Sequence, residues 1–136
     1  MNAEKFTQRT IETLNDAQNL AREKQNQTLT PEHLMYALLS QNGGLVGTLI
    51  TKIGQNFGNN NVLNNMLDEL DNAVNQLPKV TGINSELYPS SELSAVLNFA
   101  EKVAKQLKDE YISVEHLMFG LMAEGGRTVK QICDKY

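Results

Sequence analysis

The chain has 136 residues with a formal net charge of -4, and 40% of its residues are hydrophobic and 21% charged. This is typical of one soluble globular domain, here residues 1–136, and without a Lys/Arg stripe it argues against a general nucleic-acid binder. The single cysteine, Cys133, excludes an intrachain disulfide framework and a cysteine-based metal cluster.

The N-terminal segment, MNAEKFTQRTIETL, lacks the apolar core of a secretory signal. No apolar run anywhere in the chain approaches the length of about 20 residues that a membrane-spanning helix needs. We therefore expect a cytoplasmic chain that does not bind membranes.

The first half of the chain has the spacing of three helices. Apolar and small residues recur with helical period from Phe6 to about Lys24, which predicts one long amphipathic helix. Thr30 and Pro31 have the residue types of an N-cap and a first helical position, so a second helix should begin there and stop at 42–44. A short third helix is expected over 45–53, ending at Gly54.

A connector then leads to the second half. The sequence GNNN at 58–61 precedes an amphipathic pattern over 62–77, which predicts a fourth helix. The segment that follows contains Pro78 and Pro89, and we expect it to be extended because proline does not continue a helix.

The second half repeats the plan of the first. A helix should begin at Ser90 or Ser91, another is capped by Ser113 and ends at the glycines 125–126, and a final one follows. An ungapped shift of 83 positions, as from 29 to 112, maps 6–53 onto 89–136. The positions that keep the same residue in both copies are Leu14, Asn15, Ala17, Ala21, Glu32, His33, Leu34, Met35, Leu38, Gly43, Val46 and Lys52.

This duplication predicts the fold class. We expect an all-α domain in which repeat one (6–53) and repeat two (89–136), joined by the connector (54–88), pack about a pseudo-twofold axis. Each three-helix unit is too small to be stable alone, so the two units should pack against each other.

Signals for catalysis are absent from the sequence. There is no phosphate-binding G-x-x-x-x-G-K-[ST] loop. His33 and His116 each follow a glutamate directly, which is not the H-E-x-x-H spacing that places two imidazoles on one helical face. No serine, cysteine or aspartate forms a recognisable nucleophile motif with a histidine. We expect no catalytic residue, metal or cofactor in this chain.

Two features remain as candidates for binding. Phe99 stands where the first repeat has Asp16, so it either forms an apolar surface patch or packs under the extended connector. Glu32 and Glu115 occupy the second position of matching helices, where a carboxylate interacts favourably with the helix dipole. Alternatively, these carboxylates accept a cation, and the free amides beside them accept an anion.

The repeated pattern [TS]-x-E-H-L-M, the opening KFTQRTIETLNDAQNLA and the spacing between the copies resemble the double Clp-N repeat. This is the N-terminal domain of the Clp class of AAA+ unfoldases. Within that class, QLPKVTG, YPSSELSAVLNFAEKVA and DEYISVEHL are most similar to the ClpB-type disaggregases. The resemblance covers essentially the whole chain.

The resemblance implies a substrate-recognition domain that binds exposed apolar segments of unfolded or aggregated polypeptides and delivers them to the AAA+ ring of a hexameric parent. ATP and magnesium then belong to that ring and not to this domain, and a co-chaperone system acts with the parent. We expect the isolated domain to be monomeric, because no ring interface is recognisable in it.

By motif, the resemblance also implies the site residues. A hydrophobic groove on the second repeat is expected to involve Leu93, Leu97, Phe99, Val103 and His116, and the rim residues are Thr7, Asp109 and Glu115. The alternative is a ClpC-type domain that binds adaptors or phosphorylated arginine through Glu32 and Glu115. The longer connector with LPKVTG argues against this alternative.

Two features depart from the family pattern. His116 stands where an apolar residue would suit a groove better. In addition, the second repeat has no counterpart of the 62–77 segment within these residues.

Overall fold

A computed structural model describes residues 3–41, 44–80 and 87–136. The stop signal at Asn42 and Gly43 and most of the expected extended connector lie outside these residues. Within them the chain is almost entirely helical, which confirms the all-α fold class. A short 3-10 helix, Ala3–Lys5, precedes α1.

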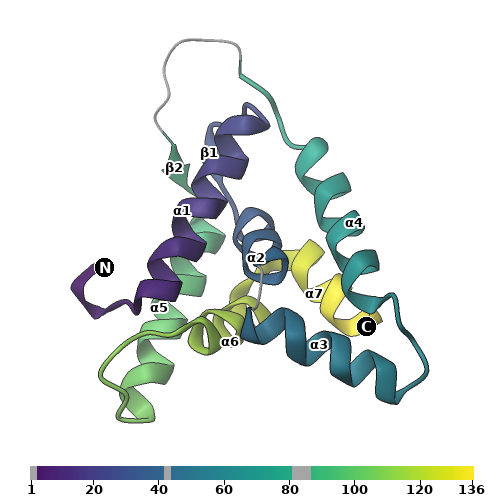
Figure 1. The fold of residues 1–136 in the computed structure, drawn as a ribbon. Coiled ribbons are helices and arrows are strands. Elements are labelled where there is room, and N and C mark those ends of the chain that lie inside the picture. The colour runs from purple at the N-terminus through teal and green to yellow at the C-terminus, as the bar shows by residue number, and fades with distance from the viewer. Residues whose placement is uncertain (1–2, 42–43, 81–86) are drawn as a thin grey trace.

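The helices follow the predicted order along the chain (Figure 1). The first repeat and the connector form α1 (Gln8–Glu23), α2 (Pro31–Ser40), α3 (Leu45–Asn56) and α4 (Val62–Asn75). The second repeat forms α5 (Ser91–Gln106), α6 (Val114–Glu124) and α7 (Gly126–Lys135). Two short strands, β1 (Thr28–Leu29) and β2 (Tyr88–Pro89), were not predicted.

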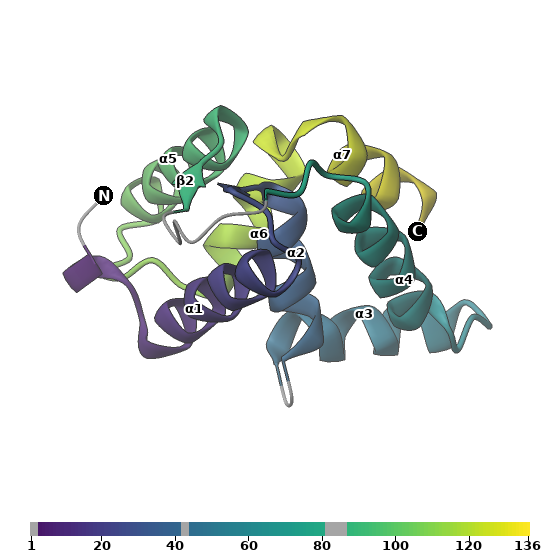
Figure 2. The same ribbon diagram turned by 90° about the horizontal axis from the view of Figure 1, so that it is seen from above.

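The duplication is visible in the helices themselves. Helices α1 and α5 are each 16 residues long and begin at residues 8 and 91, which keeps the shift of 83. Viewed from above, α2 and α6 lie in the centre, with α1 and α5 on one side and α4 and α7 on the other (Figure 2). The two repeats are therefore related by a pseudo-twofold axis that passes between α2 and α6.

Backbone hydrogen bonds exchange between the repeats. Strand β1 pairs in parallel with β2, and the Ser90 N–H donates to the carbonyl oxygen of Leu29 at 2.9 Å. At the symmetry-equivalent place Phe6 bridges Ile112, and the Thr7 N–H donates to the carbonyl oxygen of Ile112 at 3.2 Å. In each repeat, the segment before the second helix forms backbone hydrogen bonds with the segment before the first helix of the other repeat.

Two predicted boundaries were wrong, and both have a packing reason. Phe6 is not part of α1, because its backbone is taken by the bridge to Ile112. Helix α3 does not end at Gly54 but continues to Asn56. Gly54 is buried, and a Cβ there would lie 2.6 Å from the carbonyl oxygen of Asn59 and 3.0 Å from a methyl group of Val62. This glycine allows the start of α4 to approach α3.

The core lies between the helices of the two repeats. Its largest fully buried apolar side chains lie on α2, α4, α5, α6 and α7. They include Leu34, Met35, Leu38, Leu39, Leu70, Leu93, Leu117, Leu121, Val96 and Val129. Helix α6 approaches α5 closely at Gly120, where a Cβ would overlap the carbonyl oxygen of Val96. Burial of this apolar surface, at about 25 cal/mol per Å², is the main stabilising contribution.

Helices α1 and α5 end in the same way, at residues in the left-handed conformation. Gln25 has φ 61° and Lys108 has φ 60°, and these positions are equivalent by the shift of 83. The residue that follows each of them donates a backbone hydrogen bond of 2.8 Å back to the helix. The Asn26 N–H donates to the carbonyl oxygen of Ala21, and the Asp109 N–H donates to the carbonyl oxygen of Ala104. Glycine is the usual residue at this helix end, since a Cβ is strained there.

We therefore expect Gln25→Gly and Lys108→Gly each to increase the free energy of unfolding by about 0.5–1 kcal/mol, because glycine removes the strain of the positive φ. Urea denaturation of the single variants measures this. The matched control is Lys24→Gly, whose φ of -85° is ordinary, and it should lower stability. A destabilising effect of both test variants would show that the side chains outweigh the backbone strain.

Candidate functional site

An open pocket lies where the first turns of α1, α3 and α6 meet. It has a volume of about 480 Å³, and its lining residues are Thr7, Arg9, Leu45, Thr48, Ser113, Val114 and Glu115. Thr7 and Glu115, which the sequence assigned to the rim of a binding site, are thus brought together from opposite ends of the chain. The interlocked backbone segments that precede α1 and α6 make this meeting possible.

Thr7 is held in place as the N-cap of α1. Its side-chain Oγ1 accepts a hydrogen bond from the Thr10 N–H at 3.2 Å. The Thr10 hydroxyl donates to the carbonyl oxygen of Ile112 at 2.9 Å. Because the same carbonyl also accepts from the Thr7 N–H, the start of α1 is fixed relative to the start of α6.

Glu115 is exposed in the first turn of α6, and its carboxylate accepts a hydrogen bond from the Ser113 hydroxyl at 2.7 Å. A carboxylate at this position is stabilised by the helix dipole. Arg9 lines the same pocket with a positive charge, while Leu45 and Val114 supply apolar surface. The pocket therefore offers both signs of charge beside an apolar lining.

Asp109 is linked to this pocket through the buried His116. The Ser113 N–H donates to Nδ1 of His116 at 2.8 Å, and Nε2 of His116 donates to Oδ2 of Asp109 at 2.8 Å. Because a backbone donor occupies Nδ1, the neutral ring carries its proton on Nε2. His116 is thus a positioning residue that fixes the partly exposed Asp109 carboxylate, and it does not line a groove.

The row of Ser113, His116 and Asp109 has the composition of a catalytic triad, and the Ser113 hydroxyl lies 3.1 Å from Nδ1 of His116. Nδ1, however, already accepts from the Ser113 backbone N–H at 2.8 Å, and the hydroxyl donates to the nearer Glu115 carboxylate at 2.7 Å. The row is instead a helix cap in which a histidine at the third position takes the part that Glu or Gln has in a capping box.

The first repeat has the same cap with a neutral partner. The Thr30 N–H donates to Nδ1 of His33 at 3.0 Å, and Nε2 of His33 donates to Oδ1 of Asn26 at 2.9 Å. The Asn26 amide in turn donates to the carbonyl oxygen of Pro78 at 3.1 Å. Burial lowers the pKa of His33 to about 4, because the apolar surroundings disfavour the charged imidazolium.

The structure does not place the predicted groove residues on one surface. Leu93 is buried in the core and Leu97 packs against it. Phe99 and Val103 are half-buried one turn apart on another face of α5, and both alternatives for Phe99 stay predictions. Leu93 and His116 are therefore not surface residues, and a role of Leu97, Phe99 and Val103 in substrate binding stays a prediction.

Glu32 lies at the position of α2 equivalent to Glu115, but it is not among the residues that line the pocket. The sequence did not point to five of the lining residues as site residues, Arg9, Leu45, Thr48, Val114 and Ser113, the last of which it indicated only as a helix cap. They come from three helices that are far apart in the chain, and no local motif signals such a meeting.

The part of the chain that the structure describes contains no helix long and apolar enough to cross a membrane. In the same ranges, no group of three or more His, Cys, Asp or Glu side chains is arranged to hold a metal ion.

Two interlocked helical repeats with an open pocket at their junction define the class of duplicated helical-repeat domains. The sequence profile described as "Clp repeat (R) N-terminal domain" matches residues 5–136. The chain belongs to this family, which confirms the resemblance that the sequence motifs carry.

Named relatives include bacterial proteins called "Chaperone protein ClpB". That of Clostridium tetani is 36% identical over 139 residues, a match that covers 100% of this chain and 15% of the relative. That of Brucella suis is 33% identical over 132 residues, a match that covers 97% of this chain and 14% of the relative. The chain therefore spans about one seventh of the length of these relatives.

Solved structures share the fold. The N-terminal domain of Hsp104 from Candida albicans has a TM-score of 0.77 at 22% identity, over 96% of this chain and 80% of that one. A chain from structural investigations of a malarial protein secretion system has a TM-score of 0.76 at 28% identity. The match covers 96% of this chain and 84% of that one.

The buried His33 predicts a pH dependence of stability. Its pKa falls from 6.5 in the unfolded chain to about 4 in the folded one, so the unfolded state binds more protons in this interval. Stability is therefore full above pH 6.5 and declines as the pH falls towards 4, by about 3 kcal/mol over the whole interval. Urea denaturation between pH 7 and pH 4 measures this decline.

His33→Gln is the control, since glutamine keeps a capping side chain but does not titrate. This variant should start from a lower stability at pH 7 and lose the part of the pH dependence between 6.5 and 4 that belongs to His33. An unchanged slope in the variant would contradict the assignment to His33.

Proposed function

We propose that this domain is the substrate-recognition domain of a ClpB-type, ATP-dependent disaggregase. In this role it binds exposed apolar segments of unfolded or aggregated polypeptides and delivers them to the AAA+ ring of the parent protein. The observation that carries the proposal is the pocket at the repeat junction, where Thr7 and Glu115 lie beside Leu45 and Val114. The similarity to proteins named ClpB supports the same function.

The composition of the pocket suits an unfolded chain. An extended polypeptide presents apolar side chains together with backbone N–H and C=O groups that lack partners. Leu45 and Val114 offer apolar contact, which supplies about 25 cal/mol per Å² without directional demands. The Glu115 carboxylate can accept backbone N–H groups, and Arg9 can donate to carbonyl oxygens. We expect dissociation constants that are micromolar or weaker, which permits transfer to the ring.

One observation favours a second candidate, the ClpC-type binding of adaptors or phosphorylated arginine. Glu115 and Arg9 line the same pocket, and their charges are those that a guanidinium and a phosphate would require. Glu32, the other carboxylate of this alternative, does not line that pocket. A ClpC-type arrangement would therefore use this one pocket, which residues of both repeats line.

A titration of the isotope-labelled domain with a permanently unfolded protein tests the primary proposal. Amide shifts should cluster on the pocket, and Leu45→Asp should weaken binding at least about fivefold, because it places a charge in the apolar lining. Leu45 is exposed, so this change leaves the core intact. Val80→Asp is the control, because Val80 is an exposed apolar residue that does not line this pocket, and the change should leave the affinity unchanged.

Other outcomes reassign the site. Shifts centred on Leu97, Phe99 and Val103 that vanish in Phe99→Asp would place the substrate on α5. Binding of phosphoarginine, but not of the unfolded protein, that is lost in Glu115→Gln would establish the ClpC-type alternative.

A further inference from the structure

A second hollow lies beside the pocket, where the end of α2, the length of α3 and the first half of α4 meet. These three helices contact one another (Figure 1). The hollow has a volume of about 460 Å³, and we call it the α3–α4 hollow. Leu39 of α2 and Leu63 and Leu67 of α4 give it an apolar lining. The hollow therefore offers apolar contact to a ligand, as the pocket does.

The hollow and the pocket are continuous at Thr48, which lines both of them. The residues of α3 and its N-cap that line the hollow are spaced by three or four positions and so share one face. They are Gly44, Gly47, Thr48, Thr51, Lys52 and Gln55. Leu45, which lines the pocket, follows Gly44 directly. One ligand that lies along this face of α3 can therefore occupy both the pocket and the hollow.

Helix α3 gives the length of such a ligand. The lining residues of the hollow run from Gly44 to Gln55, and a rise of 1.5 Å per residue makes this about 16 Å. An extended polypeptide covers this distance with about five residues. The pocket has a similar volume, about 480 Å³, and so should take a similar number. The pocket and the hollow together therefore suit an extended segment of about ten residues.

The polar groups of the hollow favour an extended backbone over a helix. The hydroxyl groups of Thr48 and Thr51 each donate to a carbonyl oxygen of the same segment at 2.9 Å, so their oxygens keep lone pairs that can accept. The side-chain amides of Gln41 and Gln55 can both donate and accept. An extended segment brings backbone N–H and C=O groups that need partners, whereas a helix has already paired most of its own.

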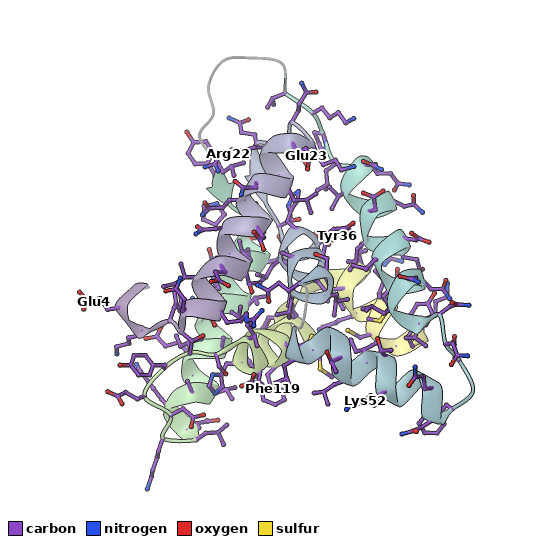
Figure 3. All side chains as sticks on the ribbon, in the orientation of Figure 1. Glu4, Arg22, Glu23, Tyr36, Lys52 and Phe119 are labelled. Atoms are coloured by element: carbon purple, nitrogen blue, oxygen red, sulfur yellow. The ribbon has the colours of Figure 1, made fainter. Side chains whose placement is uncertain are left out.

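Lys52 adds a positive charge to the hollow. It is exposed on α3, where Figure 3 labels it. It forms no ion pair with the residues that the structure describes. An ammonium group beside an apolar lining can bind a carboxylate of the ligand with a charge-assisted hydrogen bond. The hollow therefore favours a ligand with an acidic group at this end.

We propose that the α3–α4 hollow is a second subsite of the polypeptide-binding pocket. One extended segment with apolar side chains occupies both, and an acidic residue near one end of it contacts Lys52. The proposal rests on the function proposed above, because it takes the pocket as the place where the polypeptide binds. It adds two requirements to that function, a segment long enough to pass Thr48 and a negative charge beyond it.

Peptides of defined length and charge test the proposal. The probe is a Leu–Ser alternating peptide of about ten residues with an aspartate at each end, and its partners are a half-length version and one with asparagine at the ends. In an NMR titration of the isotope-labelled domain, the amides of Leu45 and Val114 and those of Thr51 and Gln55 should follow one binding curve. The half-length peptide should bind at least about tenfold more weakly, because it buries less apolar surface.

Two substitutions on α3 separate length from charge. Thr51→Trp fills the hollow and should weaken the binding of both long peptides at least about fivefold, because less apolar surface remains for them. Lys52→Glu should weaken the aspartate peptide at least about tenfold and the asparagine peptide less than about threefold, because only the first carries a carboxylate. The matched control is Lys130→Glu, since Lys130 is exposed and lines neither the pocket nor the hollow. It should leave both affinities unchanged.

Leu45→Asp distinguishes failure of this proposal from failure of the proposed function. Weaker binding in Leu45→Asp, with unchanged binding in Thr51→Trp and Lys52→Glu, would overturn the second subsite and leave the pocket as the site. Two separate binding curves would overturn the single segment that spans both. Unchanged binding in all three variants would contradict the second subsite and the proposed role of the pocket together.

Discussion

The fold depends on the reciprocal hydrogen bonding between the two repeats. The segment before α2 holds the segment before α5, and the segment before α6 holds the segment before α1. We expect neither three-helix unit to be stable alone, and these hydrogen bonds fix how the two units pack around one common core. The pocket follows from the same constraint, because the carbonyl oxygen of Ile112 accepts from both Thr7 and Thr10 and so places the N-cap of α1 beside Glu115.

Much of the fold could be predicted from the sequence because the chain contains two copies of one helical repeat. Helical spacing and the caps at Thr30 and Ser113 located the main helices, and the shift of 83 related them. The strands could not be predicted, since each is two residues long and pairs with a segment of the other repeat. Gly54 was misinterpreted as a helix end because its reason is tertiary, the close approach of α4. Thr7 and Glu115 were predicted by resemblance, but Arg9 and Leu45 join them only through the three-dimensional arrangement.

The two histidine caps show how a duplicated element diverges without losing its structural part. His33 and His116 both accept a backbone N–H at Nδ1, and this bond is part of the cap of the second helix in each repeat. The partner at Nε2 differs, since it is the buried amide of Asn26 in one copy and the partly exposed carboxylate of Asp109 in the other. In the first copy the Asn26 side chain is buried and also donates to the carbonyl oxygen of Pro78. In the second copy the Asp109 carboxylate is held by His116 at the surface. The pocket proposed as a binding site is lined by residues of both repeats, and the second repeat contributes Ser113, Val114 and Glu115 to it.

The bridge between Phe6 and Ile112 also has a consequence for the order of folding during synthesis. These residues are far apart in the sequence, so the bridge closes a very long loop and raises the contact order of the domain. The ribosome releases the chain from its N-terminus, and the first repeat is complete long before Ile112 emerges. Until then the start of α1 has no partner for its backbone and the inner face of α2 lacks α6. A nascent chain of this domain must therefore wait for nearly its whole length before it can bury its own apolar surface.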